Sequence, residues 1–511
     1  MAHAPTMHES DCNSRARAAL LILAVVTLWT ACGSSVEVAT RSGTAAGSGG
    51  SGTGGSGGGT PPPPGDTTPP SAPTGLVGTT DGPFGIDLSW QPSSDAVGVT
   101  GYIVRRNGNP VVITASTSYV DIGLTGSTAY SYVVAAQDAA GNVSPNSATA
   151  NVTTAAAPLP PLAVLPAWMT GLSIGQWIQI PSTAISSVQP NPLPAGTNSD
   201  SKVIAWTSFV MDTRTSKVYS PANGGHRNYA GNEVDVLNLE AAVPAWAQLL
   251  APTPDSQLLD CQSYYADGRP TSRHSYYGVT LNEFNDRIML FAGAQWCSAG
   301  GFHRATSSYN IGANTWSASN AHPDLPSSIS VPGVFATALD PLTGNVYIAA
   351  SSNYFRWNRS SNQFQSLNFI SGPNGTESMS AFDTTRGRFF VLGGTNSDHH
   401  YYTVASDSWT QAPIFGANAA DVSGAGQSAM FYVSAIDRYL IRLADPGGTV
   451  YQVDPRTFEI TTFLTTGGAS IPVGVVPGNG GIYNKFLYSP RLGGAVYVPQ
   501  YSTSVWFLKV N

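Results

Sequence analysis

Short apolar runs separated by polar turns fill the chain from residue 168 to the C-terminus. One unit recurs six times: an apolar run, a polar turn and a second apolar run that often ends in glycines. Runs of this length predict β-strands, and their regular repetition predicts a fold built of small sheets. The turn and the start of the second run fall at residues 216–219, 285–289, 344–347, 387–390, 437–440 and 494–497.

After these two runs each predicted unit continues with a third and a fourth strand, and an aromatic residue opens the fourth. The sixth of these residues stands at the front of the region, within residues 175–180 around Trp177. An N-terminal strand that completes the last, C-terminal sheet explains this displacement, because a closed ring has no open sheet edge. The pattern predicts an all-β, six-bladed propeller closed by that strand. The five residues in regular positions are Trp246, Trp316, Phe364, Trp409 and Phe458.

Residues 69–154 hold a second set of short alternating strands, which predicts a small β-sandwich. Its landmarks closely resemble a bacterial fibronectin type III domain. The resemblance implies that Trp90 is the core tryptophan and Tyr130 the tyrosine-corner residue, so we expect a spacer, with glycan or surface binding as the alternative. The landmarks are Leu88-Ser89-Trp90, Gly101-Tyr102-Ile103-Val104, Tyr130-Ser131-Tyr132-Val133-Val134 and Asp138-Ala139-Ala140-Gly141-Asn142.

Glycine pairs accompany several of the repeated units. Together with the aromatic residues that follow them, they resemble kelch repeats of the galactose oxidase type of propeller. The resemblance covers about residues 168–511 and departs in the third unit, where Ala349-Ala350-Ser351-Ser352 stands in place of glycines. It implies a fold and leaves the function open, because such propellers host many activities. The pairs are Gly224-Gly225, Gly300-Gly301, Gly393-Gly394 and Gly447-Gly448.

Composition narrows the class of partner. The chain has 511 residues, of which only 10% are charged, and a formal net charge of -7. A charged fraction well below the usual quarter is typical of a secreted all-β protein and not of a helix-rich cytosolic enzyme. A net negative chain has no basic field for phosphates, so we expect neither nucleic acid nor anionic lipid as partners. We expect a monomer.

The first 32 residues have the features of an export signal. Arg15 and Arg17 precede the apolar run 18–28, which is too short to span a bilayer. The sequence Thr30-Ala31-Cys32 resembles a bacterial lipobox, which implies lipidation of Cys32, although Trp29 departs from that pattern. Cleavage at an ordinary secretory site is the alternative.

Two linkers separate the predicted domains. Residues 33–68 are rich in Gly, Ser and Pro, which predicts a disordered tether, and residues 155–167 predict a Pro-rich hinge before the propeller at 168–511. By resemblance to lipoproteins, Gly33 after the cysteine favours the outer membrane.

Loops between second and third strands lie at the same end of a sheet as the loops between units, because successive antiparallel strands reverse direction. By this rule the loops 181–201, 251–273, 223–232, 293–304 and 394–400 share one face, where we expect a ligand pocket. For any single residue, capping of loop backbone is the alternative. The predicted ligand-binding residues are His226, Arg227, Asn228, Tyr229, Asn232, Arg273, His274, Tyr276, Trp296, His303, His399 and His400.

Cys261 and Cys297 both fall in loops of this face, which predicts a disulfide in an oxidising compartment. The resemblance to galactose oxidase also implies a copper site of two histidines and two tyrosines, one tyrosine joined to a cysteine. A bonded cysteine pair leaves none for that link, so we expect no cofactor, with copper as the alternative. The sequence has no His-Glu-x-x-His motif.

These features predict a binding module that is exported and lies outside a bacterial cell or is anchored in its outer membrane. Its loop-rich face is expected to recognise polysaccharide or a surface protein, because Tyr, Trp, His, Asn and Arg side chains suit stacking and hydroxyl recognition. The alternative is an extracellular carbohydrate-active enzyme, either a copper oxidase of galactose oxidase type or a glycosidase or lyase, whose paired carboxylates sequence spacing does not establish.

Overall fold

The structure is a computed structural model. It describes residues 65–80, 85–122, 124–154, 161–196, 199–204, 206–225, 228–329, 335–350, 353–367, 377–393, 399–444, 449–468, 471–472 and 481–511. The predicted export signal, Cys32 and nearly all of the tether lie outside these residues, as do His226 and Arg227. In this part of the chain no helix is both long enough and apolar enough to cross a membrane.

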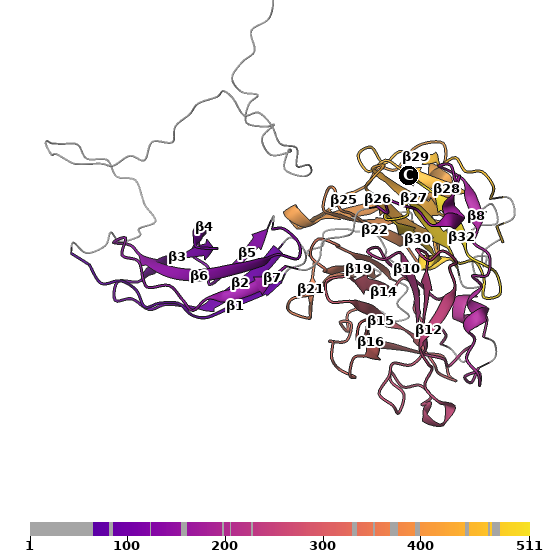
Figure 1. The fold of residues 1–511 in the computed structure, drawn as a ribbon, viewed down its shortest axis with the longest axis horizontal. Helices are drawn as coiled ribbons and strands as arrows, with labels where there is room; N and C mark the ends of the chain where they lie inside the picture. Colours follow the sequence, from indigo (N-terminus) through magenta and orange to yellow (C-terminus); the bar gives the residue numbers. More distant parts are fainter. Residues whose placement is uncertain are drawn as a thin grey trace, which may run out of the picture. The chain divides into compact units, whose positions relative to one another are not determined.

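Strands β1 to β7 form two antiparallel sheets over one shared core (Figure 1). One sheet has the order β1(Thr74–Thr80), β2(Gly85–Gln91), β5(Ser118–Ile122). The other has the order β4(Asn109–Thr114), β3(Val99–Arg106), β6(Ala129–Asp138), β7(Ala150–Thr153). Alternate side chains along each strand point into the core, as two packed sheets require.

Two aromatic residues of this sandwich occupy the positions that the fibronectin resemblance implied. Trp90 is only 4% exposed, and its ring centre lies 5.5 Å from that of Tyr102. The hydroxyl of Tyr130 accepts a hydrogen bond of 2.9 Å from the backbone N–H of Thr125, five residues upstream. Both expected roles are confirmed, and the sandwich is fibronectin type III-like.

The described residues from 161 onward form six antiparallel sheets in sequence order. Sheet 1 contains β9(Val210–Asp212), β10(Lys217–Pro221), β11(Val234–Asn238) and β12(Trp246–Leu250). Sheet 2 contains β13(Arg273–His274), β14(Val279–Asn282), β15(Arg287–Gln295), β16(Gly301–Asn310) and β17(Thr315–Trp316). Sheet 3 contains β18(Ala336–Leu339), β19(Val346–Ala350), β20(Asn353–Asn358) and β21(Gln363–Ser366).

The remaining three sheets follow the same plan. Sheet 4 contains β22(Met379–Asp383), β23(Arg388–Leu392), β24(His400–Thr403) and β25(Ser408–Gln411). Sheet 5 contains β26(Ala429–Val433), β27(Arg438–Arg442), β28(Val450–Val453) and β29(Ile460–Thr462). Sheet 6 contains β30(Phe486–Ser489), β31(Gly494–Tyr497), β32(Trp506–Lys509) and, as its fourth strand, β8(Trp177–Gln179).

The first strand of each sheet, which in sheet 2 we take as β14, contacts the first strands of the neighbouring sheets. The contacts run β9, β14, β18, β22, β26, β30, and β30 also contacts β9. Buried apolar side chains fill the space between neighbouring sheets, as between sheets 4 and 5, where Phe390 and Tyr439 have ring centres 4.8 Å apart. Each sheet therefore buries both faces, which explains the nearly continuous apolar character of strands such as β19 and β23.

Sheet 2 departs from the predicted loop pattern. Strand β15 extends to Gln295 and β16 begins at Gly301, so the predicted loop 293–304 shrinks to residues 296–300. Arg273 and His274 form the short strand β13, which pairs with the extension of β15. The expectation that Arg273, His274 and His303 are loop residues is therefore wrong, because sheet hydrogen bonds continue past the apolar run that defined the strand.

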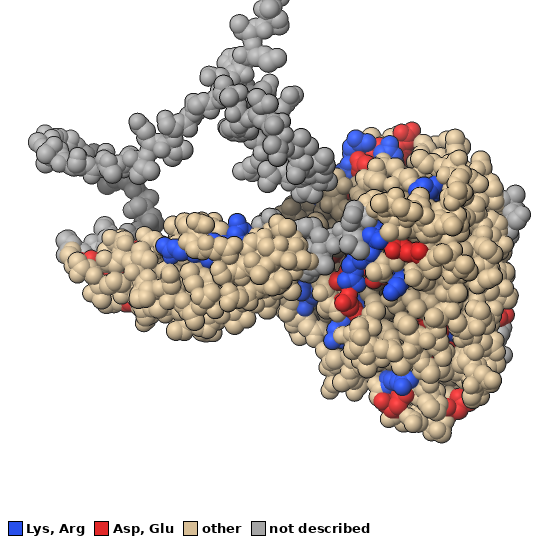
Figure 2. Space-filling view, viewed as in Figure 1, with Lys and Arg blue, Asp and Glu red and all other residues tan. Residues whose placement is uncertain are grey.

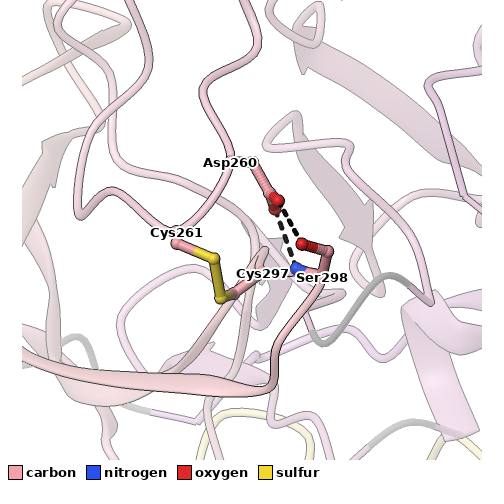
Figure 3. Close-up of a disulfide and its surroundings, with 4 residues drawn as sticks. All are labelled: Asp260, Cys261, Cys297 and Ser298. Atoms are coloured by element: carbon pink, nitrogen blue, oxygen red, sulfur yellow. Dashed lines mark hydrogen bonds between the residues drawn. A yellow bond between two sulfur atoms is a disulfide. The ribbon is translucent and has the colours of Figure 1, made fainter.

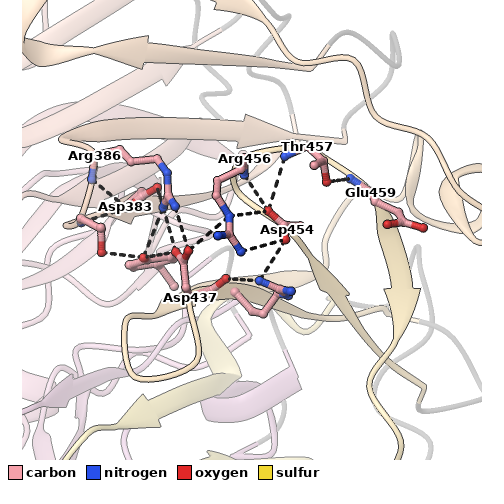
Figure 4. A network of polar contacts seen from close by, with 10 residues as sticks. Asp383, Arg386, Asp437, Asp454, Arg456, Thr457 and Glu459 are labelled. Atoms are coloured by element: carbon pink, nitrogen blue, oxygen red, sulfur yellow. Dashed lines mark hydrogen bonds and ion pairs between the residues drawn. The ribbon is translucent and has the colours of Figure 1, made fainter. Parts of the chain in front are cut away.

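Turns between first and second strands lie at one end of the sheets, which we call the turn face. A carboxylate at the end of a first strand commonly accepts backbone N–H groups of its own turn, as Asp383 does from Thr385 at 2.9 Å and Arg386 at 3.0 Å. Arg386 also bridges to Asp437 of sheet 5 at 2.8 Å (Figure 4). This hydrogen-bonded pairing lowers the pKa of Asp437 to about 2.

A disulfide joins two loops at the opposite end of sheet 2. Cys261, in the loop before β13, is bonded to Cys297, in the loop between β15 and β16 (Figure 3). Beside it, the Asp260 carboxylate accepts the backbone N–H of Ser298 at 2.8 Å and also the Ser298 hydroxyl. The predicted disulfide is confirmed, and with it the placement of these two loops at one end of the sheets.

Removing the disulfide is expected to destabilise the fold. The bond closes a loop with a sequence separation of 36 residues, and a loop of this size is associated with about 3 to 4 kcal/mol of stability. The double variant Cys261→Ser/Cys297→Ser should lose that amount in denaturant unfolding of the full chain, and wild-type protein kept reduced should match it. Free Cys261 and Cys297 thiols in peptide mass spectrometry of unreduced protein would contradict the assignment.

Candidate functional site

The loops that enter the first strands lie, with the loops between second and third strands, at the end of the sheets that we call the loop face. Just before five first strands the backbone adopts the left-handed conformation, with φ of 49° at Trp206, 48° at Tyr276, 58° at Glu377, 58° at Gln427 and 36° at Tyr483. The corresponding residues before β18 lie outside the described residues. Each such residue costs about 1–3 kcal/mol, and such strain is concentrated at functional sites.

Aromatic rings gather among these strained positions. The ring centres of Trp206 and His274 lie 5.0 Å apart, and Tyr483 lies 5.7 Å from Tyr276 and 4.9 Å from Tyr277. Trp206 is partly exposed, whereas the three tyrosines are buried. Since they come from sheets 1, 2 and 6, the loop face brings together residues from both ends of the repeat region. We call this set the aromatic cluster.

A pocket of about 500 Å³ opens next to the aromatic cluster, between sheets 4 and 5. Glu377, Asp421, Gln427 and Tyr451 supply its polar side chains, and the turn 424–426 forms one wall. The hydroxyl of Tyr277 donates a 2.6 Å hydrogen bond to the backbone carbonyl of Ser428, which also lines the pocket. This bond joins the aromatic cluster to the pocket wall.

The tyrosines of the cluster stay protonated. Burial raises the pKa of Tyr276, Tyr277 and Tyr483 above the ordinary value, and the nearby charge of Glu377 raises each further. Their hydroxyls are therefore hydrogen-bond donors at any physiological pH. The hydroxyl of Tyr483 is buried and has no hydrogen-bond partner within the described residues.

Lys485 lies behind the aromatic cluster at the start of sheet 6. It is 1% exposed, its Nζ donates a 2.8 Å hydrogen bond to the Gly481 carbonyl, and the same atom lies 5.8 Å from the ring centre of Tyr483. Burial lowers its pKa from 10.5 to about 7. Burial therefore disfavours the charged ammonium form in the folded protein, whereas a lysine with the ordinary pKa of 10.5 is charged at neutral pH.

The predicted ligand-binding residues are mostly buried, in strands as well as in loops. Eight of the ten that the structure describes are less than a tenth exposed, and Asn228 and Trp296 are the two that are partly exposed. His274 Nε2 lies 3.2 Å from Asn228 Oδ1. Gly225, with φ of 88°, lets the loop backbone lie close to β13 and β15, because a Cβ there would lie 2.4 Å from the Ala294 carbonyl and 2.7 Å from the His274 backbone nitrogen. The eight are Tyr229, Asn232, Arg273, His274, Tyr276, His303, His399 and His400.

The buried members of this set hold the loops in place. Asn232 Nδ2 donates to Thr253 Oγ1 at 2.9 Å and to the Pro270 carbonyl at 2.8 Å. His399 Nδ1 accepts the backbone N–H of Gly393 at 3.2 Å. Arg273 is fully buried, donates to the Ala292 carbonyl at 3.3 Å, and has its pKa lowered by burial to about 10.

Burial also governs the protonation of His303. Desolvation, followed by the charge of Arg273, lowers the pKa of His303 well below its ordinary value, so this imidazole is neutral. His303 Nδ1 accepts the backbone N–H of Ala305 at 3.0 Å. His400 lies in β24, where it pairs with Val391 and Gln411 of the neighbouring strands.

A buried ionic group beneath the loop 223–232 was not foreseen from the sequence. Lys202 Nζ lies 2.7 Å from Glu233 Oε1 and 2.5 Å from Asp235 Oδ2, and all three side chains are at most 2% exposed. Burial alone would lower the pKa of Lys202, but the two carboxylates reverse the shift and raise it. The group orders α1(Ser201–Ile204) against sheet 1, since breaking a buried pair is strongly destabilising.

Glu377 and Gln427 were also missed as site residues. A sequence signal was present, because each precedes a serine and then an apolar strand, in Glu377-Ser378-Met379 and Gln427-Ser428-Ala429. When the units are aligned on the first residue of their first strands, Glu377 and Gln427 occupy the same position, just before the serine that precedes the strand.

No protein-family model matches the chain. Segments of it are similar to parts of larger curated proteins: chitinase Chi52 of Paenibacillus xylanexedens, at 49% identity over 86 residues, exoglucanase B of Cellulomonas fimi, at 49% over 89, and an alpha-amylase of Niallia circulans, at 47% over 87. Each match covers 17% of this chain but only 16%, 8% and 7% of the respective relative.

The length of these matches corresponds to the fibronectin type III-like sandwich, so they concern that part of the chain. Among solved structures, that of FN3tt is similar over 18% of this chain and 100% of its own, with 21% identity and a TM-score of 0.16. A protein of unknown function from Bacteroides thetaiotaomicron aligns over 86% of this chain with 10% identity and a TM-score of 0.40.

The variant Lys485→Met is expected to be more stable than wild type at neutral pH. Between pH values of about 7 and 10.5 the unfolded chain holds a proton on Lys485 that the folded protein lacks, so wild-type stability rises with pH. The gap between variant and wild type should narrow by up to about 1.4 kcal/mol per pH unit. Urea unfolding at several pH values measures it, and a gap independent of pH would contradict the burial argument.

Proposed function

We propose that this chain is an exported polysaccharide-binding protein that recognises its ligand through the loop face. One observation carries the substrate class: the sandwich segment is close to half identical to segments of a chitinase, an exoglucanase and an alpha-amylase. All three names refer to enzymes that act on polysaccharides. Since the chain matches only a small share of each relative, their activities are not transferred to it.

For the larger part we propose a closed, six-bladed, kelch-like propeller over residues 168–511, preceded by a hinge at 155–167 and a fibronectin type III-like spacer at 69–154. Support comes from the six sheets in sequence order, the contact of β30 with β9, and β8 as the fourth strand of sheet 6. A ring of sheets closed in this way leaves no open sheet edge where its two ends meet. Because open edges pair with strands of other chains, their absence from the proposed ring favours a monomer.

Export is proposed from the signal-like residues 1–32 and agrees with the disulfide, which needs an oxidising compartment. Lipidation at Cys32 would anchor the protein in the outer membrane, and simple secretion is the alternative. The tether at 33–68 would hold the folded domains away from the membrane. A surface protein is the alternative partner.

On the loop face, we propose that the partly exposed Trp206, Asn228 and Trp296 contact the ligand directly and that the buried histidines and Arg273 support them. Aromatic faces stack on sugar rings, and amide side chains pair with hydroxyls. On the side of the molecule shown in Figure 2, charged side chains are sparse and of both signs.

The variant Trp206→Ala should weaken polysaccharide binding about five- to thirtyfold, because a partly exposed aromatic platform contributes on the order of 1–2 kcal/mol. Phe284→Ala is the matched control, since Phe284 is a partly buried aromatic residue in a turn of the turn face. Affinity electrophoresis of the full chain in gels containing soluble chitin derivatives, β-glucan or starch measures the loss. Absence of retardation in every gel would refute the proposal.

A second candidate function is glycoside hydrolysis, which is favoured by the presence of Glu377 and Asp421 in one pocket. Hydrolysis needs one carboxylic acid as proton donor and one carboxylate as base or nucleophile. Time-dependent release of reducing ends that disappears in both Glu377→Gln and Asp421→Asn would establish the enzyme. For a binding protein we expect no release above the level of heat-denatured protein.

A further inference from the structure

The pocket between sheets 4 and 5 has an unusual charge for this chain. Glu377 and Asp421 contribute two carboxylates, and the described residues of its lining include no lysine, arginine or histidine. It is therefore a site of negative potential on the loop face. A uronate or a sulfated sugar would be repelled there, whereas a ligand with a positive charge would be attracted.

The hydrogen-bonding groups of the pocket are mostly acceptors. Glu377 Oε1 accepts a bond of 3.0 Å from Gln427 Nε2, and Asp421 Oδ2 accepts bonds of 3.2 Å from the Tyr451 hydroxyl and 3.4 Å from Asn418 Nδ2. Since a carboxylate has about four acceptor positions, both retain capacity for further donors. Gln427 is 9% exposed, and its Oε1 is a buried acceptor that has no hydrogen-bond partner within the described residues.

The hydrogen-bond donors of the pocket wall at residues 425–428 already donate to carbonyl groups of the protein. The backbone N–H groups of Ala425 and Gly426 donate to the Val422 and Gly424 carbonyls at 3.1 and 3.0 Å. The N–H of Gln427 donates to the Glu377 carbonyl at 3.2 Å. The Ser428 hydroxyl donates to the Gly426 carbonyl, also at 3.2 Å. A complementary ligand must therefore bring donors of its own.

We propose that this pocket binds the protonated amino group of a hexosamine unit, such as glucosamine within a polysaccharide. An ammonium brings three N–H donors and one positive charge, which match two carboxylates and an unpartnered amide oxygen. An N-acetylated unit has neither the charge nor the three donors. The inference rests on the proposed polysaccharide function and names the sugar that this pocket selects.

The wild-type protein provides the first test. Isothermal titration of the full chain in mildly acidic buffer compares a glucosamine pentamer with the N-acetylglucosamine pentamer of the same length. We expect the glucosamine pentamer to bind at least about tenfold more tightly, since a hydrogen bond to a charged group contributes about 1.5–3 kcal/mol. This comparison does not depend on the folding of any variant.

Substitutions then locate the selectivity. Glu377→Gln and Asp421→Asn keep the shape of each side chain and remove its charge, so each should lower affinity for the glucosamine pentamer about tenfold and leave the N-acetylated pentamer unaffected. Glu459→Gln is the matched control, because Glu459 is exposed, lies outside the pocket lining and gives the same change in net charge. Equal losses in all three variants would indicate a general charge effect and overturn the pocket assignment.

The remaining outcomes separate this inference from the proposed function. Equal affinity of wild type for both pentamers, with no effect of either substitution, would overturn the amino-group assignment and leave polysaccharide binding intact. Failure of both pentamers together with failure of every polysaccharide gel would overturn the proposed function itself.

Discussion

The antiparallel pairing of β8 with β32 is the contact on which the six-sheet part depends. It joins residues 177–179 to residues 506–508, so that the two ends of this part lie in one sheet. The β8 strand is also fixed to its neighbours: the N–H of Trp177 donates to the Thr466 carbonyl at 2.9 Å, and the guanidinium of Arg442 lies 5.7 Å from the Trp177 ring centre. On the other side, Trp246 Nε1 of sheet 1 donates to the Thr183 carbonyl at 2.9 Å. Sheets 5, 6 and 1 are thus coupled through one short strand, and its loss would expose an edge of β32.

This coupling also explains the strain at the loop face. When the first strands are fixed in mutual contact, each entering loop must turn sharply into a strand whose position is already determined. Trp206, Tyr276, Glu377, Gln427 and Tyr483 absorb this turn in the left-handed conformation. Packing of buried rings such as Tyr277 against Tyr483, 4.9 Å apart, holds the strained backbone in place. The same geometry directs polar and aromatic side chains toward each other, so that the site is a consequence of how the sheets are held together.

Properties that depend on local patterns were predictable from the sequence. Alternation of apolar and polar residues located the six strand units, the displaced Trp177 located the N-terminal strand of sheet 6, and Trp90 and the Cys261–Cys297 bond were placed correctly. The site was not predictable in the same way. Whether Arg273 or His303 faces solvent depends on how far β15 and β16 extend, and hydrogen bonds between strands decide that after folding. Glu377 and Asp421 are 44 positions apart in sequence, and their shared pocket exists only because α2(Ala419–Val422) and the loop before β26 return beside the start of β22.

In a chain with only 10% charged residues, the surroundings of each charge are informative. At the turn face, ion pairs join neighbouring sheets: Arg214 pairs with Asp286 at 2.6 Å and Arg491 with Glu240 at 2.5 Å. In the interior, Lys202 is matched by two carboxylates. The pocket of Glu377 and Asp421 follows neither pattern, because the described part of its lining contains no cation and its carboxylates accept hydrogen bonds from neutral side chains. Neither carboxylate is matched by a cation among the described lining residues, which supports the ligand selection that we propose for them. If a glycan binds at the loop face as we propose, the negative potential of this pocket disfavours acidic polysaccharides.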